Sequence, residues 1–230
     1  MPTDLPPNIA TFGGDIDAVI SFIWWIVGVW FVASEALLVY LLIRYRKRDG
    51  ERAAWMPADT LKTTAWVLVP VFLVLLCDLA IEAKSHGVWD HVKGELPAHD
   101  ELVRVTARQF AWTFTYAGGD GELDTADDFR TVSELHVPRG ENVRFELESV
   151  DVLHAFWVPA LRLKQDAVPG RTISGWFNAT EEGSYDLACA ELCGPAHGAM
   201  RGKLVVHAAD SYRAWSAAMA EQHRELASYR

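Results

Sequence analysis

Apolar positions divide this chain into two unlike parts. Residues 18–43 and 63–83 hold two long apolar runs, and each is long enough to cross a bilayer as a helix, which needs roughly 20 residues. Pro70 lies inside the second run, and membrane helices tolerate proline because neighbouring groups satisfy the freed carbonyl. The pattern therefore predicts a transmembrane hairpin, preceded by a short N-terminal segment at residues 1–17.

After a polar linker at residues 84–99, the periodicity changes. Short runs in which apolar and polar residues alternate indicate half-buried strands, and turn sequences such as Val168-Pro169-Gly170 separate them. The clearest runs are residues 103–106, 112–116, 143–147, 173–177, 185–187 and 204–206. Many short strands with such turns predict an all-β sandwich or barrel over residues 100–208. Residues 209–230 predict a short closing amphipathic helix, with Asp210 or Ser211 as its N-cap.

The loop between the two apolar runs, residues 44–62, is basic. Its positive side chains are Arg44, Arg46, Lys47, Arg48, Arg52 and Lys62. Because Lys and Arg accumulate on the cytoplasmic side of membranes, this loop is predicted to be cytoplasmic. Both termini are then expected on the outer, periplasmic face of the cell membrane. Glu35 lies inside the first apolar run and is a candidate for a proton path, since an acid within a membrane helix is a functional candidate by default. The alternatives are a neutral carboxyl group or one that is hydrogen-bonded to another subunit.

The overall composition excludes some functions. The formal net charge is −10, which does not favour nucleic acid because phosphates need Lys and Arg, but it suits a basic protein partner. Three cysteines are too few for a disulfide scaffold. No Cys-x-x-Cys-His sequence occurs, so the chain is expected to carry no c-type haem of its own.

The densest chemistry lies in residues 189–200, whose sequence is Cys-Ala-Glu-Leu-Cys-Gly-Pro-Ala-His-Gly-Ala-Met. This stretch supplies two thiols, an imidazole and a thioether, and His154 adds a second imidazole from an upstream loop. Soft sulfur with imidazole is the ligand set that selects copper. Two thiolates are one more than a single blue-copper site needs, so the set suits two copper ions bridged by Cys189 and Cys193. Such a site implies electron transfer.

Two other readings of these residues remain open at this point. A structural zinc site also uses Cys and His, although Met200 and the three-residue spacing between the cysteines favour copper. A membrane-tethered copper chaperone or thiol oxidoreductase would place the cysteines in a mixed βαβ context, whereas the flanking pattern here is all-β.

The same residues resemble those of a known family. Cys189-x-Glu191-x-Cys193-Gly-x-x-His197-x-x-Met200, the Asp151-Val-Leu-His154 sequence and the run from Leu163 to Arg171 resemble subunit 2 of the haem–copper cytochrome c oxidases. The resemblance extends from the first apolar run to the last strand. It implies that the sandwich is a Greek-key fold of the cupredoxin type.

The resemblance also implies a cofactor and partners. The cofactor would be a binuclear copper A centre, with His154 and Met200 completing one copper and His197 and the backbone carbonyl of Glu191 completing the other. The Glu191 side chain would help to bind magnesium or manganese at the boundary with subunit 1. Electrons would come from cytochrome c or a similar donor and pass to a haem in subunit 1, where oxygen is reduced to water. Subunit 3 is a further expected partner.

The sequence departs from the family pattern at several positions. The family often receives electrons at a Trp-rich stretch, and here Phe110 and Ala111 stand where Trp and Tyr are common, followed by Trp112. Phe110 and Trp112 are therefore the candidates for receiving electrons. Thr63 stands where the family tends to carry a glutamate at a proton-channel mouth. Residues 120–128 form an inserted acidic loop, which is most simply a solvated hairpin loop.

Related proteins with other functions provide the alternatives. The quinol-oxidase subunit 2 has the same fold as a copper-free structural subunit, but it has lost the ligands that this chain keeps. Nitrous-oxide reductases share the copper motif, but they need a much larger catalytic domain than 230 residues allow.

Overall fold

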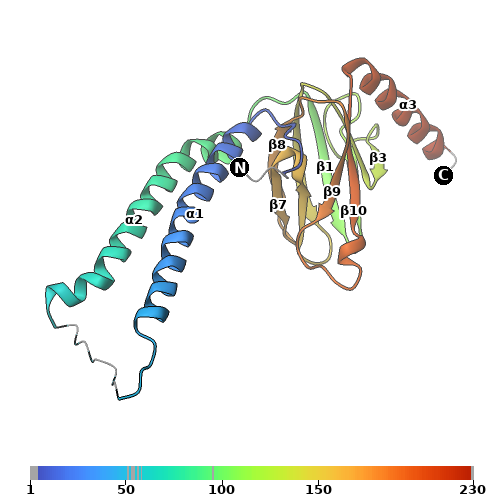
Figure 1. Cartoon of the computed structure of the whole chain (residues 1–230). Helices are drawn as coiled ribbons and strands as arrows, with labels where there is room; N and C mark the ends of the chain where they lie inside the picture. The colour runs from blue at the N-terminus through green and yellow to red at the C-terminus, as the bar shows by residue number, and fades with distance from the viewer. Residues whose placement is uncertain are drawn as a thin grey trace. The chain divides into compact units, whose positions relative to one another are not determined.

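Two long helices and a sandwich of ten strands make up most of the chain (Figure 1). The computed structural model describes residues 5–228, apart from residues 51, 53, 54, 56, 58 and 95. Parts of the predicted loop at 44–62 and the extreme ends of the chain thus lie outside the described residues. Contacts divide the chain into two units, of which one is residues 15–90 and the other combines the residues up to 14 with residues 91–230.

The first unit is a helical hairpin. Helix α1 spans Gly13–Arg44 and α2 spans Leu61–Trp89, followed by a π-helical turn at Asp90–Gly94. Both helices are long and apolar enough to cross a membrane, and their apolar stretches are not buried inside the protein. The indole Nε1 of Trp30 donates a hydrogen bond to Sγ of Cys77 over 3.4 Å, which links the two helices.

Both helices are longer than the apolar runs. Helix α1 begins five residues before the predicted position 18, and α2 continues through residues 84–89, which the sequence pattern assigned to a linker. The reason is that the apolar runs mark only the stretch suited to the membrane interior, whereas the backbone hydrogen bonds of a helix continue through the polar residues that flank it. Helix α2 begins at a capping box, in which Thr60 and Thr63 bond each other's backbone N–H groups.

The second unit contains the sandwich that the strand pattern predicted, and the predicted fold class is confirmed. One sheet has the order β3-β2-β1-β5-β8 and the other the order β4-β10-β9-β6-β7. The strands are β1 Glu101–Arg108, β2 Ala111–Tyr116, β3 Phe129–Val132, β4 Glu134–Pro138, β5 Asn142–Ser149, β6 His154–Val158, β7 Leu163–Ala167, β8 Ile173–Asn178, β9 Gly183–Cys189 and β10 Arg201–His207. Short 3₁₀ turns occur at Pro159–Leu161 and His197–Ala199.

The alternating strands build the core. In β5, every second residue is buried and its neighbours are half-buried, so one face of the strand contacts the opposite sheet. Strands β1 and β5 pair in parallel, with Val105 opposite Leu147. The largest fully buried side chains between the sheets include Trp112, Phe114, Phe145, Phe156 and Phe177. Edge-on and tilted aromatic contacts connect several of these rings.

The N-terminal segment belongs to this core. The N–H of Ile9 donates to the carbonyl of Ala160 at 2.9 Å, and the N–H of Thr180 donates to the carbonyl of Ile9 at 2.7 Å. Ile9 and Phe12 are 0 % and 1 % exposed, respectively. The segment that the sequence pattern left as a short outer extension therefore forms an extra edge of the sandwich.

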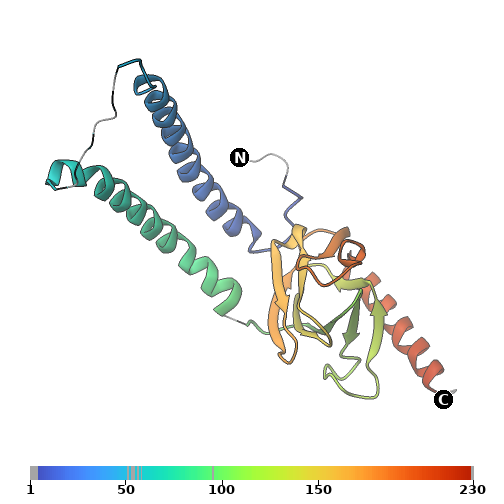
Figure 2. The same cartoon turned by 90° about the horizontal axis from the view of Figure 1, so that it is seen from below.

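The chain ends in helix α3, Ala209–Ser228. Its first half covers one edge of the sandwich, because Tyr212 is buried and Trp215 packs against the rings of Tyr116 and Phe129. Its second half is exposed from Glu221 to Leu226, and this part of the helix extends away from the strands (Figure 2).

Candidate metal centre

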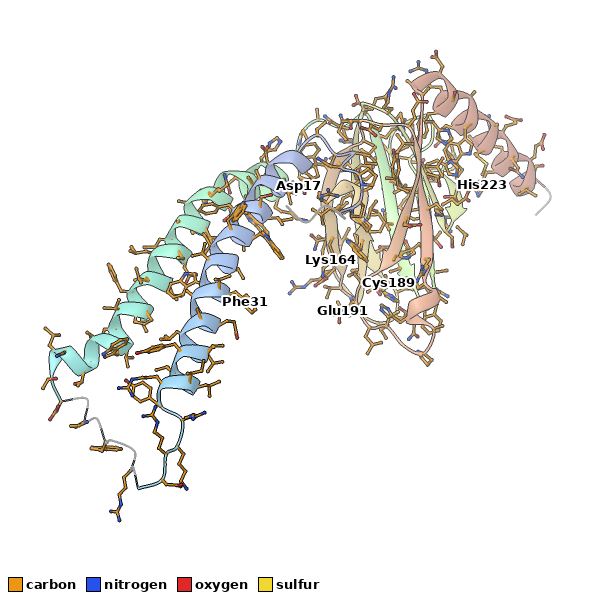
Figure 3. The ribbon with its side chains drawn as sticks, viewed as in Figure 1. Asp17, Phe31, Lys164, Cys189, Glu191 and His223 are labelled. Atoms are coloured by element: carbon orange, nitrogen blue, oxygen red, sulfur yellow. The ribbon has the colours of Figure 1, made fainter. Side chains whose placement is uncertain are left out.

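Two of the predicted ligands, Cys189 and Glu191, lie close together toward one end of the sandwich (Figure 3). Strand β9 ends at Cys189, and β10 begins directly after Met200. The antiparallel pairing of these strands brings both ends of the intervening loop together, and the N–H of Cys189 donates to the carbonyl of Met200 at 3.0 Å. The 189–200 loop is therefore anchored at both ends by the sheet.

His154 reaches the same place through a different strand. It is the first residue of β6, which pairs with β9 so that Phe156 lies opposite Cys189. The sequence pattern placed His154 on a loop, whereas the structure places it at the start of a strand. The strand position matters because it aligns the imidazole with the 189–200 loop across 35 residues of sequence.

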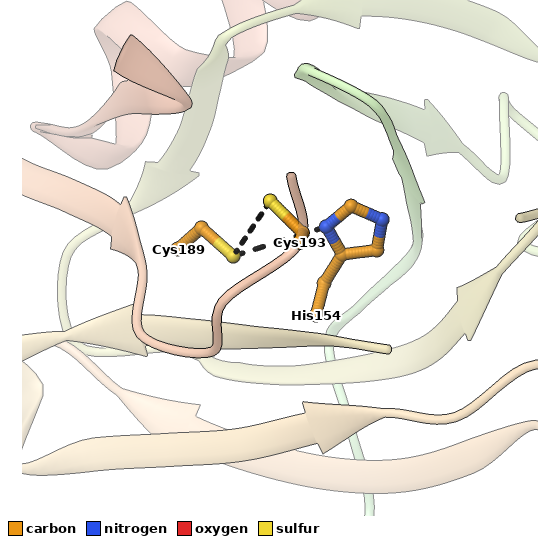
Figure 4. A group of neighbouring side chains, drawn as sticks. All are labelled: His154, Cys189 and Cys193. Atoms are coloured by element: carbon orange, nitrogen blue, oxygen red, sulfur yellow. Dashed lines mark hydrogen bonds between the residues drawn. The ribbon is translucent and has the colours of Figure 1, made fainter. Parts of the chain in front are cut away.

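Two unpaired thiols form the middle of the site. Sγ of Cys189 lies 3.8 Å from Sγ of Cys193, and both cysteines are free. Nδ1 of His154 lies 3.8 Å from Sγ of Cys189 (Figure 4). The ligand atoms of these three buried residues all lie within 4.8 Å of one another. Such a cluster of soft donors away from water is the kind of site that binds a thiophilic metal.

The remaining predicted ligands surround the same sulfur pair. Nδ1 of His197 lies 3.7 Å from Sγ of Cys193, and Sδ of Met200 lies 3.9 Å from it. The Glu191 carbonyl lies 3.2 Å from Sγ of Cys189. The other four positions that the sequence singled out therefore converge on the two cysteine sulfur atoms.

The exposure of these ligands differs. His154 and Met200 are completely buried, whereas His197 and Glu191 are half-buried. Leu192, between the two cysteines, is 78 % exposed. The site thus has an inner side at His154 and Met200 and an outer side at His197 and Leu192.

Asp151 orients the buried histidine. Its Oδ1 lies 2.8 Å from Nε2 of His154, so this nitrogen carries the proton and leaves Nδ1 free to face Cys189. Burial raises the pKa of Asp151, but N–H groups of Gln109, His154 and Val152 outweigh this effect and lower it to about 2. The carboxylate is therefore ionised throughout the physiological pH range.

The surroundings have the opposite net effect on the pKa of the Cys193 thiol. Burial raises the pKa of Cys193 to about 11, and the adjacent Cys189 thiol adds to this increase. A thiol held in its protonated form becomes a metal ligand only when it loses its proton, and a bound cation supplies the driving force. Metal binding at this pair should therefore release protons.

The two aromatic candidates have different positions. Phe110 is half-buried and lies against Gly194 of the 189–200 loop. Trp112 is completely buried, with its ring centroid 6.2 Å from that of His154. Another protein can thus touch Phe110 directly, whereas Trp112 contacts the site only from inside.

Glu35 is distant in sequence from the predicted metal ligands and belongs to the other unit of the chain. It is exposed on α1, and it forms no hydrogen bond or ion pair with the part of the chain that the structure describes. A role in proton transfer therefore stays a prediction.

Sequence reasoning assigned no role to Gln109 and Asp151, although both support the site. The signal for Asp151 was its position three residues before His154, which lets its carboxylate reach the ring. Gln109 carried no comparable signal, because its contacts span 42 and 84 residues.

Comparisons with known proteins identify the family of this chain. The family model described as cytochrome c oxidase subunit II, periplasmic domain, matches residues 102–209. The alternative cytochrome c oxidase subunit 2 of Bradyrhizobium diazoefficiens is 35 % identical, over 90 % of this chain and 81 % of that protein. Cytochrome c oxidase subunit 2 of Thermostichus vulcanus is 30 % identical, over 80 % of this chain and 69 % of that protein.

A solved structure shows the same fold. The crystal structure of the periplasmic domain of subunit II of cytochrome oxidase from Bradyrhizobium japonicum superposes with a TM-score of 0.51 and 27 % identity, covering 56 % of this chain and 99 % of that domain. Because the family model matches the sandwich and a curated relative is 35 % identical over most of both chains, this chain belongs to the cytochrome c oxidase subunit 2 family.

Proposed function

We propose that this chain accepts electrons for a haem–copper oxidase through a binuclear copper A centre held by His154, Cys189, Glu191, Cys193, His197 and Met200. The observation that carries the proposal is the convergence of three side-chain donors, from His154, His197 and Met200, and the Glu191 carbonyl on the pair of cysteine sulfurs. The coarser role, a subunit of an oxidoreductase complex, follows from the family.

The donor set fits copper. Two sulfurs that lie 3.8 Å apart without a disulfide are free to be shared by two ions, and imidazole nitrogens face them from opposite ends. A thioether at Met200 is a weak ligand typical of copper sites. When bound, such a pair of ions would take up and release one electron at a time.

The protein contributes rigidity and exclusion of water. Cys189 and His154 lie at the ends of paired strands, and Asp151 holds the His154 ring in one tautomer. Ligands that keep their positions in both oxidation states lower the cost of electron transfer, because little has to reorganise. Complete burial of His154 and Met200 keeps the inner side of the site dry.

The other readings are less well supported. A zinc site does not use thioether sulfur, whereas Sδ of Met200 lies 3.9 Å from Sγ of Cys193, nearly as close as Nδ1 of His197 at 3.7 Å. A copper-free structural subunit would have no reason to keep six donors converging on one point. The all-β surroundings of both cysteines also differ from those of a thiol oxidoreductase.

We infer the path of electrons from exposure and charge. The half-buried His197 and Phe110 provide the accessible side, and the acidic charge of the chain suits a basic donor such as a c-type cytochrome. Electrons would then pass to a haem in subunit 1, where oxygen is reduced to water. The side chain of Glu191 would contribute to a magnesium or manganese site at that boundary, and subunit 3 would complete the complex.

The orientation in the membrane follows from connectivity. Residues 5–14 and residues 91–228 belong to one unit, and two helices suited to cross the membrane lie between them in sequence. An even number of crossings returns the chain to the side on which it began. With the basic loop in the cytoplasm, the sandwich and both termini would lie on the outer face.

The test is spectroscopic. The full chain in detergent is reduced, loaded with copper, partly oxidised and examined by X-band electron paramagnetic resonance, visible absorbance and metal analysis. An electron shared equally by two copper nuclei gives a seven-line hyperfine pattern, together with two copper ions per chain. A four-line pattern, or preferential retention of zinc, would contradict the proposal.

A further inference from the structure

Gln109 contacts both segments that carry the predicted copper ligands. It lies in the turn between β1 and β2. Its backbone N–H donates to Oδ2 of Asp151 at 2.7 Å. Its side-chain amide Nε2 donates to the backbone carbonyl of Cys193. Gln109, which lies between two strands of one sheet, therefore contacts two segments of the other sheet: the segment before β6 and the loop after β9.

These contacts form a continuous hydrogen-bonded chain. The other carboxylate oxygen of Asp151 accepts from Nε2 of His154 at 2.8 Å and from the N–H of Val152 at 2.7 Å. The chain thus runs from the His154 ring through Asp151 and Gln109 to the peptide of Cys193. It connects one ligand of the pair of sulfurs to the backbone that carries one of those sulfurs.

The backbone next to Cys193 is adapted to this contact. Gly194 has φ of +137°, a conformation that residues with a Cβ rarely adopt. A Cβ on Gly194 would lie 2.9 Å from Nε2 of Gln109 and 3.1 Å from the Phe110 ring. Glycine at this position therefore allows the turn between β1 and β2 to approach the 189–200 loop closely.

We propose that Gln109 is a positioning residue for the copper A ligands, and that its side-chain amide fixes the Cys193 peptide relative to the His154–Asp151 pair. The inference rests on the proposed copper function. Hydrogen bonds behind metal ligands commonly determine ligand orientation, and their loss costs about 10- to 100-fold in metal affinity or activity. Gln109 makes this contact from the surface of the protein, where it is exposed.

This exposure separates positioning from packing. Truncation of an exposed side chain leaves no buried cavity, so it should not lower stability as a core substitution does. Gln109→Ala also leaves the backbone N–H that holds Asp151 in place. The substitution therefore removes only the link to the Cys193 carbonyl.

The experiment compares Gln109→Ala and Gln109→Glu with the wild-type chain and with Arg108→Gln, a matched change at the adjacent exposed residue. Each full-length protein is loaded with copper, and three quantities are measured: the hyperfine pattern, the midpoint potential and the rate of copper loss to a chelator. Circular dichroism and thermal unfolding report whether the fold is intact.

We expect Gln109→Ala to keep two copper ions and the wild-type fold, to lose copper about tenfold faster, and to show unequal hyperfine coupling and a shifted potential. Gln109→Glu should have a larger effect, because a carboxylate cannot donate to the Cys193 carbonyl. Arg108→Gln should match the wild type.

Two outcomes are decisive in different ways. If the wild type shows the seven-line pattern and both Gln109 variants match it in coupling, potential and copper loss, the positioning role is wrong and the copper function stands. If the wild type itself binds no copper pair, the proposed function fails, and the positioning role falls with it.

Discussion

His136 and His207 share a hydrogen bond beneath helix α3: Nδ1 of His136 lies 2.8 Å from Nε2 of His207. Both rings stack with the indole of Trp215, at centroid distances of 4.2 and 6.0 Å. Because two ring nitrogens face each other, one must donate and the other accept. Protonation of both rings would place two cations side by side under the helix.

This pair predicts a loss of stability in mild acid. Burial lowers the pKa of His136, with His207 adding to the effect and Glu134 opposing it. Burial also lowers the pKa of His207, with Glu182 opposing it. Below the ordinary value of 6.5, the unfolded chain binds protons that the folded chain does not, so the free energy of unfolding falls as pH falls.

The measurement is hydrogen-exchange protection of the amides of α3 between pH 7.5 and pH 5.5, an interval of about two units around the ordinary histidine pKa. Protection should decrease in the wild type and decrease less in His207→Gln. His223→Gln is the control, because His223 lies on the exposed end of α3 (Figure 3). An equal decrease in wild type and His207→Gln would show that the histidine pair does not anchor the helix.

Phe12 predicts that the N-terminal segment stabilises the sandwich. Its side chain is 1 % exposed and meets the Trp176 ring edge-on at 5.3 Å. Phe12→Ala should lower the free energy of unfolding of the sandwich by about 3–5 kcal/mol, as truncation of a buried Phe usually does. Thermal unfolding in detergent, followed by the β-sheet signal, provides the measurement. Leu5→Ala, at a side chain that is 45 % exposed, should have little effect. Equal midpoints for both variants would mean that the segment does not pack in solution.

Gly194 offers a test of the backbone beside the candidate metal site. Gly194→Ala must place a Cβ at φ of +137° and within 3.1 Å of Phe110, so it should cost about 1–3 kcal/mol of strain and slow copper loading. Gly198→Ala lies in the same loop, where a Cβ meets no heavy atom within 4 Å. Thermal unfolding and copper stoichiometry are measured for both. The prediction is wrong if the two alanine variants behave alike.

We expect Met200 to be a weak copper ligand that adjusts the midpoint potential of the centre. Met200→Leu keeps the volume of a completely buried side chain, so it should cost less than about 1.5 kcal/mol. Removal of a weak donor should leave the seven-line pattern and raise the midpoint potential, since the oxidised state loses electron density. Cys193→Ser, by contrast, should abolish the pattern because it removes one of the two sulfurs that both ions would share. Loss of all copper from Met200→Leu would show that the thioether is a main ligand.

Strands with clear apolar–polar alternation could be predicted from the sequence, because alternation depends only on neighbouring residues. The strands with clear alternation, such as residues 143–147, lie inside strands of the structure. Strand β6 lacked this signal because four of its five residues are buried, and a strand buried on both faces has no alternation. Strand β7 has the largely polar sequence Leu-Lys-Gln-Asp-Ala, which shows no strand-like alternation. Its extended conformation is stabilised by hydrogen-bonded pairing with β6.

For this protein, the sequence by itself determined two membrane-length helices, an all-β second half and the chemical identity of the candidate metal ligands, because each depends on composition or on spacing over a few residues. Only the tertiary structure decided which distant groups meet. It placed His154 beside Cys189, Gln109 beside Cys193, and Ile9 beside Ala160. The physical reason is that these contacts depend on strand pairing within each sheet and on packing of one sheet against the other, and the order of strands follows from burial of the whole core rather than from any local run of residues.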